Sequence, residues 1–214
     1  NSKMRIKLLL SGIFILFFLS DDLFAGSKIY LIRHASVQIE NPGWCNVEGA
    51  LSYKEEYNTS QIYAFDAEVV LNRISYHETC DTVFCSPQLR AVQTANQLFN
   101  DDVILKIDEN LRELDYPIIL LPLVKLPIRA WLVISRFSWT VLNRHNEKPS
   151  YNQRKTNLKE FSKELVAHAE ENGISIVIAH GMVNLELIRI LKKQGWKFEQ
   201  KEGLSNLAVN CLVK

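Results

Sequence analysis

The sequence predicts an α/β domain built as a three-layer sandwich with a mostly parallel central sheet. Short apolar runs rich in β-branched residues alternate along the chain with stretches of helical periodicity, a pattern typical of layered α/β folds. The length of 214 residues corresponds to one domain at roughly 150 residues per domain. Hydrophobic residues make up 47% and charged residues 23%, which excludes a disordered chain. The net charge of +1 gives no electrostatic support for nucleic-acid binding.

The first 25 residues are set apart from this domain. Three basic residues precede an apolar run over residues 8–19, and small residues follow at positions 25 and 26. This order is typical of a secretory signal peptide. As a helix the run would extend about 18 Å, short of a roughly 30 Å hydrocarbon core, so a signal peptide is favoured over a membrane segment. A buried first helix and an uncleaved anchor stay open as alternatives.

Export would place the protein in the bacterial periplasm or cell envelope; without a signal function it would stay in the cytoplasm. An oxidising compartment would permit a disulfide among the four Cys residues, although buried free thiols are the more common arrangement. These thiols stand at positions 45, 80, 85 and 211.

Five strands and at least two amphipathic helices are expected in the remainder. The strands are predicted at residues 28–32, 81–85, 102–107, 174–179 and 207–213. Apolar residues recur at helical spacing over residues 158–169 and again over residues 183–191, and each set predicts a helix with one buried face. No repeat or low-complexity linker divides the chain into further domains.

Polar side chains follow three of these strands. Arg33 and His34 follow the first strand, residues 86–90 follow the second, and His180 follows the fourth. Ligands of open α/β sheets bind outside the carboxyl ends of the strands. We therefore expect these side chains to form one site.

The segment after the second strand is predicted to begin a helix. Ser86 is a suitable N-cap and Pro87 a suitable first helical residue, which puts Arg90 in the first turn. A helix N-terminus combined with arginines and two imidazoles indicates a site for a dianion.

Four sequence blocks resemble the histidine phosphatase (phosphoglycerate mutase-like) superfamily, in the family's order. Residues 31–35, Leu-Ile-Arg-His-Ala, resemble its RHG-type signature, and residues 86–95, Ser-Pro-Gln-Leu-Arg-Ala-Val-Gln-Thr-Ala, are similar to its second block. Residues 111–113 resemble the block that carries the acid, and residues 177–181 the late His-Gly block. The resemblance covers residues 28 to 181, most of the predicted domain.

The resemblance implies a role for each of five residues. His34 would attack phosphorus in line and form a phosphohistidine, which water then hydrolyses. Arg33, Arg90 and His180 would bind the phosphoryl oxygens and stabilise the transition state. Glu113 would protonate the leaving oxygen and then assist the attacking water. No metal or other cofactor is expected, because no cluster has metal-ligand spacing.

Two departures from the family pattern limit what the resemblance implies. Ala35 replaces the usual Gly, a change between two small residues. Leu-Asp-Tyr-Pro at residues 114–117 replaces the Gly-x-Trp-Glu-Gly stretch that often follows the acid in mutases and sugar-phosphate phosphatases. The substrate therefore cannot be carried over, and Asp115 becomes a second candidate acid.

Other hydrolase chemistries find less support. Only four residues separate Cys85 from Arg90, one fewer than in the loop of Cys-based phosphatases. The sequence has neither a P-loop nor a Gly-x-Ser-x-Gly elbow.

Residues 117–146 are strongly apolar and carry basic residues without any acidic one. The basic residues are Lys125, Arg129, Arg136 and Arg144. On a helix that begins near Pro127 the three arginines would fall within about 80° of one another. The family commonly inserts its substrate-covering cap here, so a helical cap insertion is expected at about residues 117–146. The alternative is a peripheral membrane element that contacts anionic lipid or a lipid-linked phosphate, with an uncleaved N-terminus holding the domain against the bilayer.

The sequence thus predicts a domain over residues 26–214 that acts as a metal-independent phosphomonoesterase. Its expected partner is a phosphorylated small molecule or a lipid-linked phosphate. Within the enzyme class, a phosphosugar mutase and a protein-phosphohistidine phosphatase are alternatives. Outside that class, a catalytically silent phosphate-binding module is the alternative. The presence of both a nucleophile and an acid argues against the silent module, since a binder needs neither.

Overall fold

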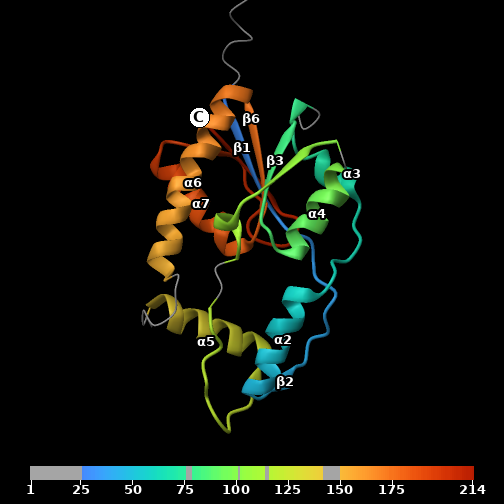
Figure 1. Cartoon of the computed structure of the whole chain (residues 1–214), viewed down its shortest axis with the longest axis vertical. Coiled ribbons are helices and arrows are strands. Elements are labelled where there is room, and N and C mark those ends of the chain that lie inside the picture. Colours follow the sequence, from blue (N-terminus) through green and yellow to red (C-terminus); the bar gives the residue numbers. More distant parts are fainter. Residues whose placement is uncertain (1–25, 76–78, 101, 114–115, 142–149) are drawn as a thin grey trace, which may run out of the picture.

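A six-stranded sheet in the order β4-β3-β6-β1-β8-β7 forms the centre of the molecule (Figure 1). The computed structural model describes residues 26–75, 79–100, 102–113, 116–141 and 150–214. Four strands run parallel, β8 is antiparallel to β1, and β7 is antiparallel to β8. The parallel strands are β1 (Lys28–Arg33), β3 (Thr82–Cys85), β4 (Ile104–Ile107) and β6 (Ile174–Ala179). The predicted α/β class with a mostly parallel sheet is confirmed.

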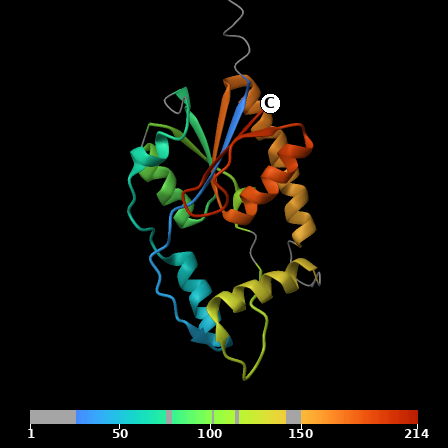
Figure 2. The same cartoon turned by 180° about the vertical axis from the view of Figure 1, so that it is seen from behind.

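Helices cover both faces of the sheet (Figures 1 and 2). The side chains of β1 alternate between the two faces: Ile29 and Leu31 belong to one buried cluster, and Tyr30 and Ile32 to the other. The first cluster packs against α6 (Tyr151–Asn172) and α7 (Gly181–Lys193), and the second against α3 (Ala67–Leu71) and α4 (Leu89–Phe99). The apolar stripes predicted on the two C-terminal helices are buried in the first cluster.

The C-terminal part of the sheet differs from the prediction. The last strand, β8 (Val209–Val213), begins two residues later than expected, and β7 (Lys197–Gln200) was not predicted. β7 lies at the edge of the sheet, and its residues alternate between exposed and half-buried. It lacks the apolar run on which the other strands were recognised.

The helix after β3 begins at Leu89 rather than at Pro87, so the predicted start was wrong. Gln88 is its N-cap and has an extended backbone with φ −74° and ψ 136°. Ser86 Oγ instead accepts a hydrogen bond from the backbone N–H of Gln88 at 3.3 Å. Arg90 still lies in the first turn, as predicted.

Two separate segments of the chain form a cap beyond the carboxyl ends of the parallel strands (Figure 1). The first contains β2 (Trp44–Cys45) and α2 (Val47–Thr59), and the second contains β5 (Leu126–Pro127) and α5 (Ile128–Val141). β2 and β5 pair in antiparallel fashion, and Ala50, Ile118, Ile128 and Trp131 are the buried core of the cap. The insertion expected at 117–146 therefore supplies only half of the cap, and residues 142–146, including Arg144, lie outside the described residues.

The two ends of the described chain lie together at the end of the sheet that is farther from the cap, where β1 begins and β8 finishes (Figure 2). The backbone N–H of Lys214 donates to the Ser27 carbonyl at 3.3 Å. All four Cys residues are free thiols. In the described ranges no helix has the length and apolarity needed to cross a membrane. The predicted signal segment, residues 1–25, lies outside those ranges.

Candidate active site

The register of three adjacent strands brings the predicted site residues together. Arg33 lies opposite Ala179 in the β1–β6 pair, and Cys85 lies opposite Ile178 in the β3–β6 pair. The pattern continues one residue past the strands, where the backbone N–H groups of His34 and Ser86 donate to β6 carbonyls at 3.0 Å each. His34, Ser86 and His180 therefore meet at one edge of the sheet.

The imidazole of His34 is fully buried and held in one orientation. Its Nδ1 lies 2.7 Å from the Ala35 carbonyl oxygen. A carbonyl only accepts, so Nδ1 carries the proton and Nε2 keeps its lone pair. Nε2 is buried and has no hydrogen-bond partner among the described residues. Burial, with smaller contributions from Arg90 and Arg33, lowers the pKa of His34 to about 3, so the ring is neutral near pH 7.

His180 lies beside His34, with 5.1 Å between the ring centroids. Its Nε2 is 2.8 Å from Ser86 Oγ, and its Nδ1 is 3.7 Å from Oε2 of Glu113. Burial and then the neighbouring His34 and arginines lower the pKa of His180 well below its usual range. The second imidazole is thus also neutral near pH 7, with Glu113 on its other side.

Arg33 is fixed by the loop between β7 and β8. Its Nη1 donates to the Leu204 carbonyl at 2.5 Å, and its Nε is buried without a hydrogen-bond partner among the described residues. A Cβ atom at Gly181 would lie 3.6 Å from that Nε, so the start of α7 passes close to the Arg33 side chain.

Arg90 reaches the site from the first turn of α4. Its Nη1 donates to Asn58 Oδ1 at 3.1 Å, its Nη2 donates to Gln88 Oε1 at 3.2 Å, and its guanidinium carbon lies 4.8 Å from the centre of the Tyr57 ring. Two of these contacts come from α2, so the cap and the sheet domain meet on this arginine. Such a fork with ordered donors suits the oxygens of a phosphoryl group.

Glu113 follows the short 3-10 helix η3 (Glu109–Leu111) and is held by its backbone. Its N–H donates to Gln88 Oε1 at 2.8 Å, the same oxygen that accepts from Arg90. Gln88 therefore fixes the position of Glu113 relative to Arg90. Asp115, the second candidate acid, lies outside the described residues.

Sequence reasoning missed five residues that complete the site. Gln88, Tyr57 and Asn58 contact Arg90 as described above. Asn206 Nδ2 donates to the His34 carbonyl at 2.8 Å, and Thr94 Oγ1 accepts from the Ala35 N–H at 2.9 Å. Gln88 and Thr94 belong to the sequence block that resembles the family, so that block could have indicated them. The other three lie on segments in which the sequence gave no signal.

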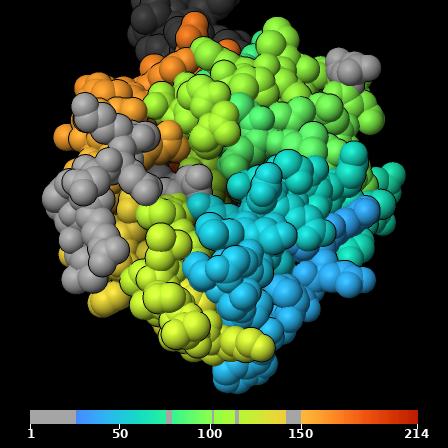
Figure 3. All heavy atoms as spheres, turned by 60° about the horizontal axis from the view of Figure 1, so that its bottom comes forward, coloured from blue at the N-terminus to red at the C-terminus, as the bar shows by residue number. Residues whose placement is uncertain are grey.

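Two guanidinium groups around two neutral imidazoles make a pocket with a net positive charge. Such a pocket is suited to a phosphoryl dianion, with an unprotonated nitrogen ready to form a bond to it. Across the described residues no group of three or more His, Cys, Asp or Glu side chains could hold a metal ion. The cap segments α2 and 116–141 lie side by side over this end of the molecule (Figure 3).

The fold and the grouping of arginines and imidazoles at the strand ends are those expected of an α/β phosphatase. Comparison with known families agrees: the histidine phosphatase superfamily (branch 1) matches residues 29–213. The chain belongs to this superfamily and is a phosphatase. A search of curated proteins found no match.

Solved structures share the fold at low sequence identity. Phosphoserine phosphatase from Entamoeba histolytica, solved with 3-phosphoglyceric acid, matches with a TM-score of 0.51 and 15% identity over 86% of this chain and 89% of its own. The YhfR protein of Bacillus stearothermophilus gives 0.53 and 15% over 86% and 89%, and ecdysone phosphate phosphatase from Bombix mori gives 0.53 and 12% over 88% and 92%. The agreement with these structures shows the fold.

Proposed function

We propose that this phosphatase hydrolyses phosphomonoesters through a phosphohistidine on His34 without a metal ion. The observation that carries this proposal is the state of the His34 ring. Its Nδ1 is tied to the Ala35 carbonyl, while its Nε2 is buried and has no partner in the described part of the chain. An imidazole that is neutral and fixed in this way is a nucleophile at the pH of the cell.

In the first step Nε2 attacks phosphorus in line, the N–P bond forms and the bond from phosphorus to the ester oxygen breaks. Arg33, Arg90 and His180 surround the phosphoryl oxygens and stabilise their charge. Glu113 gives its proton to the leaving oxygen and so releases a neutral alcohol. Its Oε2 is near enough to His180 Nδ1, at 3.7 Å, to act on the same phosphoryl group.

In the second step a water molecule attacks the phosphohistidine. The carboxylate of Glu113 takes a proton from this water, the new O–P bond forms and the N–P bond breaks. Inorganic phosphate leaves, and His34 returns to its neutral form. Glu113 thus regains in the second step the proton that it gave up in the first, and the lone pair of His34 Nε2 is restored when the N–P bond breaks.

The direct test is hydrolysis of an aryl phosphate in the presence of EDTA by the wild type and His34→Ala. We expect turnover in the wild type, none in His34→Ala, and normal turnover in His168→Gln, which changes a histidine outside the pocket. A labelled, alkali-stable phosphoenzyme should form only when His34 is present. Turnover that persists in His34→Ala would refute the mechanism.

The alternatives predict different results. A silent phosphate-binding module would bind vanadate without turnover, and a mutase would return the phosphoryl group to a second hydroxyl of the substrate rather than to water. A protein-phosphohistidine phosphatase would transfer the phosphoryl group from a phosphohistidine of its protein substrate to His34, with no ester as the donor. The residues after the acid that often accompany mutase activity are absent here, which disfavours the mutase.

The partner we propose is a phosphorylated small molecule. The pocket lies under the cap and is bounded by polar and aromatic side chains from α2. Solved structures with the same fold contain compact phosphorylated acids. Phosphoserine phosphatase from Entamoeba histolytica was solved with 3-phosphoglyceric acid and, as a mutant, with phosphoserine. A lipid-linked phosphate is the alternative substrate, and a phosphatidic acid in the substrate panel separates the two.

We also propose that the outer face of the cap contacts an anionic lipid surface. Val133, Phe137 and Val141 form one stripe along α5 and are 67%, 59% and 58% exposed. Leu120 and Leu123, before β5, are exposed as well. Apolar side chains on the solvent face of a helix are typical of an interfacial element when basic residues flank them.

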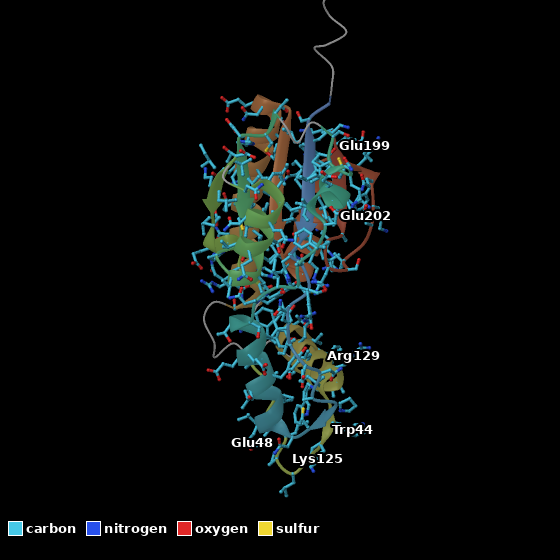
Figure 4. All side chains as sticks on the ribbon, turned by 90° about the vertical axis from the view of Figure 1, so that its right-hand side faces the viewer. Trp44, Glu48, Lys125, Arg129, Glu199 and Glu202 are labelled. Carbon is cyan, nitrogen blue, oxygen red and sulfur yellow. The ribbon has the colours of Figure 1, made fainter. Side chains whose placement is uncertain are left out.

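Basic residues do flank this outer face. Lys125 and Arg129 are exposed, and the described residues 116–141 contain no acidic side chain. Figure 4 shows both with Trp44 at the far end of the cap, with Glu48 on the other side of it. Arg136, predicted to lie on the same basic face, instead turns to Tyr116, so the basic face is smaller than the sequence suggested.

Vesicle flotation tests this contact. The wild type should float with vesicles that contain phosphatidylserine, and Phe137→Ser should float several-fold less. Val69→Ser, which changes an equally exposed valine on α3, serves as the control. No flotation, or equal flotation of both variants, would refute the lipid contact. If the wild type is a dimer and Phe137→Ser is a monomer, the face instead binds a second copy of the chain.

The N-terminal 25 residues, proposed as an export signal, would direct the protein to the periplasm or cell envelope. Fractionation of cells that express the chain with and without residues 1–25 tests this. Export that does not depend on those residues would refute the proposal.

A further inference from the structure

Helix α2 of the cap contacts Arg90 of the phosphate pocket with two adjacent residues. The Arg90 guanidinium carbon lies 4.8 Å from the centre of the Tyr57 ring, and its Nη1 donates to Asn58 Oδ1 at 3.1 Å. Tyr57 also lies beside the proposed nucleophile, since its ring centre is 6.4 Å from that of His34. The cap thus reaches the centre of the pocket through an arginine that is proposed to bind the phosphoryl oxygens.

Tyr57 is held in turn by the core of the cap. Ala50, Tyr53 and Tyr57 follow one another at intervals of three and four residues, so they lie along one stripe of α2. Ala50 is buried in the cap core, and Tyr53 packs against that core. The Tyr53 and Tyr57 rings are stacked, with 6.3 Å between their centres and 29° between their planes. A continuous row of contacts therefore connects the cap core with Arg90.

A second attachment joins the end of α2 to the helix that carries Arg90. Gln93 lies one turn after Arg90 on α4. Its Oε1 accepts from the backbone N–H of Ile62 at 3.1 Å, and its Nε2 donates to Gln61 Oε1 at 2.6 Å. α2 ends just before these residues, and Figure 1 shows it next to α4. Contacts one helical turn apart thus tie α2 to the first part of α4.

The apolar face of α2 is small. Only Ala50 among its 13 residues is buried, so burial of apolar surface contributes little to the position of this helix. The contacts with Arg90 are therefore a large share of what holds α2 in place. An event that changes Arg90 should be felt by α2, and the reverse should hold as well.

The chemical character of these contacts suits a phosphate-binding arginine. The Tyr57 ring and the Asn58 amide carry no charge, so they orient the guanidinium group and leave its positive charge to the ligand. Arginine has several rotatable bonds, and fixing them before the ligand arrives removes part of the entropic cost of binding. The ring restricts where the guanidinium group lies and the amide restricts how it is turned, so the two contacts complement each other.

We propose that Tyr57 and Asn58 are positioning residues that hold Arg90 ready for a phosphoryl group, so that the pocket is complete only when α2 is docked. This inference rests on the phosphate pocket of the proposed function and specifies how the cap contributes to it. Thermodynamic linkage makes the effect reciprocal: docked α2 raises the affinity for a phosphate dianion, and the bound dianion stabilises docked α2 by the same factor. Phosphate alone, without any leaving group, should therefore order the cap.

Calorimetric titration of the full chain with inorganic phosphate measures the first half of this linkage. Tyr57→Leu should weaken the affinity about five- to thirtyfold because the ring contact is lost, and Asn58→Leu about three- to tenfold. Tyr57→Phe keeps the ring and should restore the affinity to within about twofold of the wild type. Phe198→Leu is the matched control: it removes a ring on β7 that has two lysine ammonium groups 5.7 Å from its centre, and it should leave the affinity unchanged.

Hydrogen exchange of the α2 amides measures the second half. Saturating phosphate should slow their exchange about five- to thirtyfold in the wild type, the factor that the linkage transfers from affinity to docking. The same addition should slow it less than about threefold in Tyr57→Leu. Tyr57→Phe and Phe198→Leu should respond as the wild type does.

Circular dichroism establishes that the variants are folded. Asn58→Leu, a change at an exposed position, provides the answer if Tyr57→Leu is not folded. Unchanged phosphate affinity in the folded variants, failure of Tyr57→Phe to restore it, or exchange in α2 that does not respond to phosphate would overturn the inference. Absence of measurable phosphate binding by the wild type would overturn it as well.

Failure of this inference differs from failure of the proposed function, because binding of phosphate requires no turnover. Hydrolysis of an aryl phosphate by the wild type, with phosphate affinity unchanged in Tyr57→Leu, would refute the role of α2 and leave the phosphohistidine mechanism intact. Weakened phosphate binding in Tyr57→Leu, rescued by Tyr57→Phe, without hydrolysis by the wild type would support the role of α2 and refute the mechanism.

Discussion

Acidification should destabilise this protein through its two buried imidazoles. His34 and His180 are both 0% exposed, and burial is the main cause that lowers the pKa of His34 from 6.5 to about 3 and of His180 well below 6.5. In the unfolded chain each ring takes up a proton near pH 6.5. The unfolded state therefore binds more protons between these pKa values, so stability is complete above about pH 6.5 and is lost as the pH falls towards 3.

The size of this effect follows from the linkage relation. One extra proton on the unfolded state lowers the free energy of unfolding by about 1.4 kcal/mol for each pH unit. At pH 5, one and a half units below the pKa of an unfolded histidine, the buried ring of His34 should lower the free energy of unfolding by about 2 kcal/mol. This is a large share of the roughly 5–15 kcal/mol of a natural domain, and protonation of His180 in the unfolded chain acts in the same direction.

Urea unfolding at pH 8, 6.5 and 5, followed by tryptophan fluorescence, measures this loss. Carboxylates titrate over the same range, and comparison of His34→Gln with the wild type cancels their contribution. We expect the variant to lose about 2 kcal/mol less than the wild type between pH 8 and pH 5, whereas His168→Gln, outside the pocket, should follow the wild type. Equal pH dependence of His34→Gln and the wild type would show that the buried ring takes up a proton without cost and would refute the reasoning.

Three further substitutions test contacts that the sequence did not reveal. Gln88→Leu should lower kcat/KM for an aryl phosphate about ten- to a hundredfold, because the acceptor that positions Glu113 is lost; an unchanged value would show that the backbone alone fixes the acid. Asn206→Ala should reduce the free energy of unfolding, measured in urea, by about 1 kcal/mol, because the hydrogen bond to the His34 carbonyl is lost. No change would show that water replaces Asn206 as the donor to this carbonyl. Trp131→Ala should cost about 3–5 kcal/mol and increase hydrogen exchange in α2 and α5 while the sheet stays protected; uniform exchange throughout would contradict an independent cap core.

The sequence was most informative where the site depends on local order along the chain. Arg33, His34 and His180 directly follow or end predicted parallel strands, and the rule that such strands end at one edge was enough to bring them together. Arg90 was placed in a first helical turn by the helix-start signals at Ser86 and Pro87, although the helix begins two residues later than predicted. These residues are adjacent in space because of backbone pairing, which short apolar runs reveal.

The remaining contacts depend on side chains from distant segments and could not be predicted in this way. Asn206 reaches His34 across 172 positions of the chain, and Asn58 reaches Arg90 from a helix with weak amphipathic character. α2 was not predicted because only Ala50 of its 13 residues is buried. A helix that packs on a small cap and faces a polar pocket has no broad apolar stripe to identify it.

The position of the chain ends separates two ideas that the sequence had joined. An uncleaved N-terminal segment was expected to hold the domain, and with it the apolar cap, against one bilayer. Gly26 instead lies beside Lys214, at the start of β1, and the cap lies beyond the other end of that strand. Six strand residues extend about 20 Å, so the point at which an anchor would join the domain and the cap lie at least that far apart. Anchoring through the N-terminus and lipid contact through α5 therefore involve opposite ends of the domain and are tested separately. Flotation of the full chain and of residues 26–214, each with and without Phe137→Ser, distinguishes them. If the cap contacts the lipid, residues 26–214 should float and Phe137→Ser should reduce this flotation; if only the N-terminal segment binds, residues 26–214 should not float.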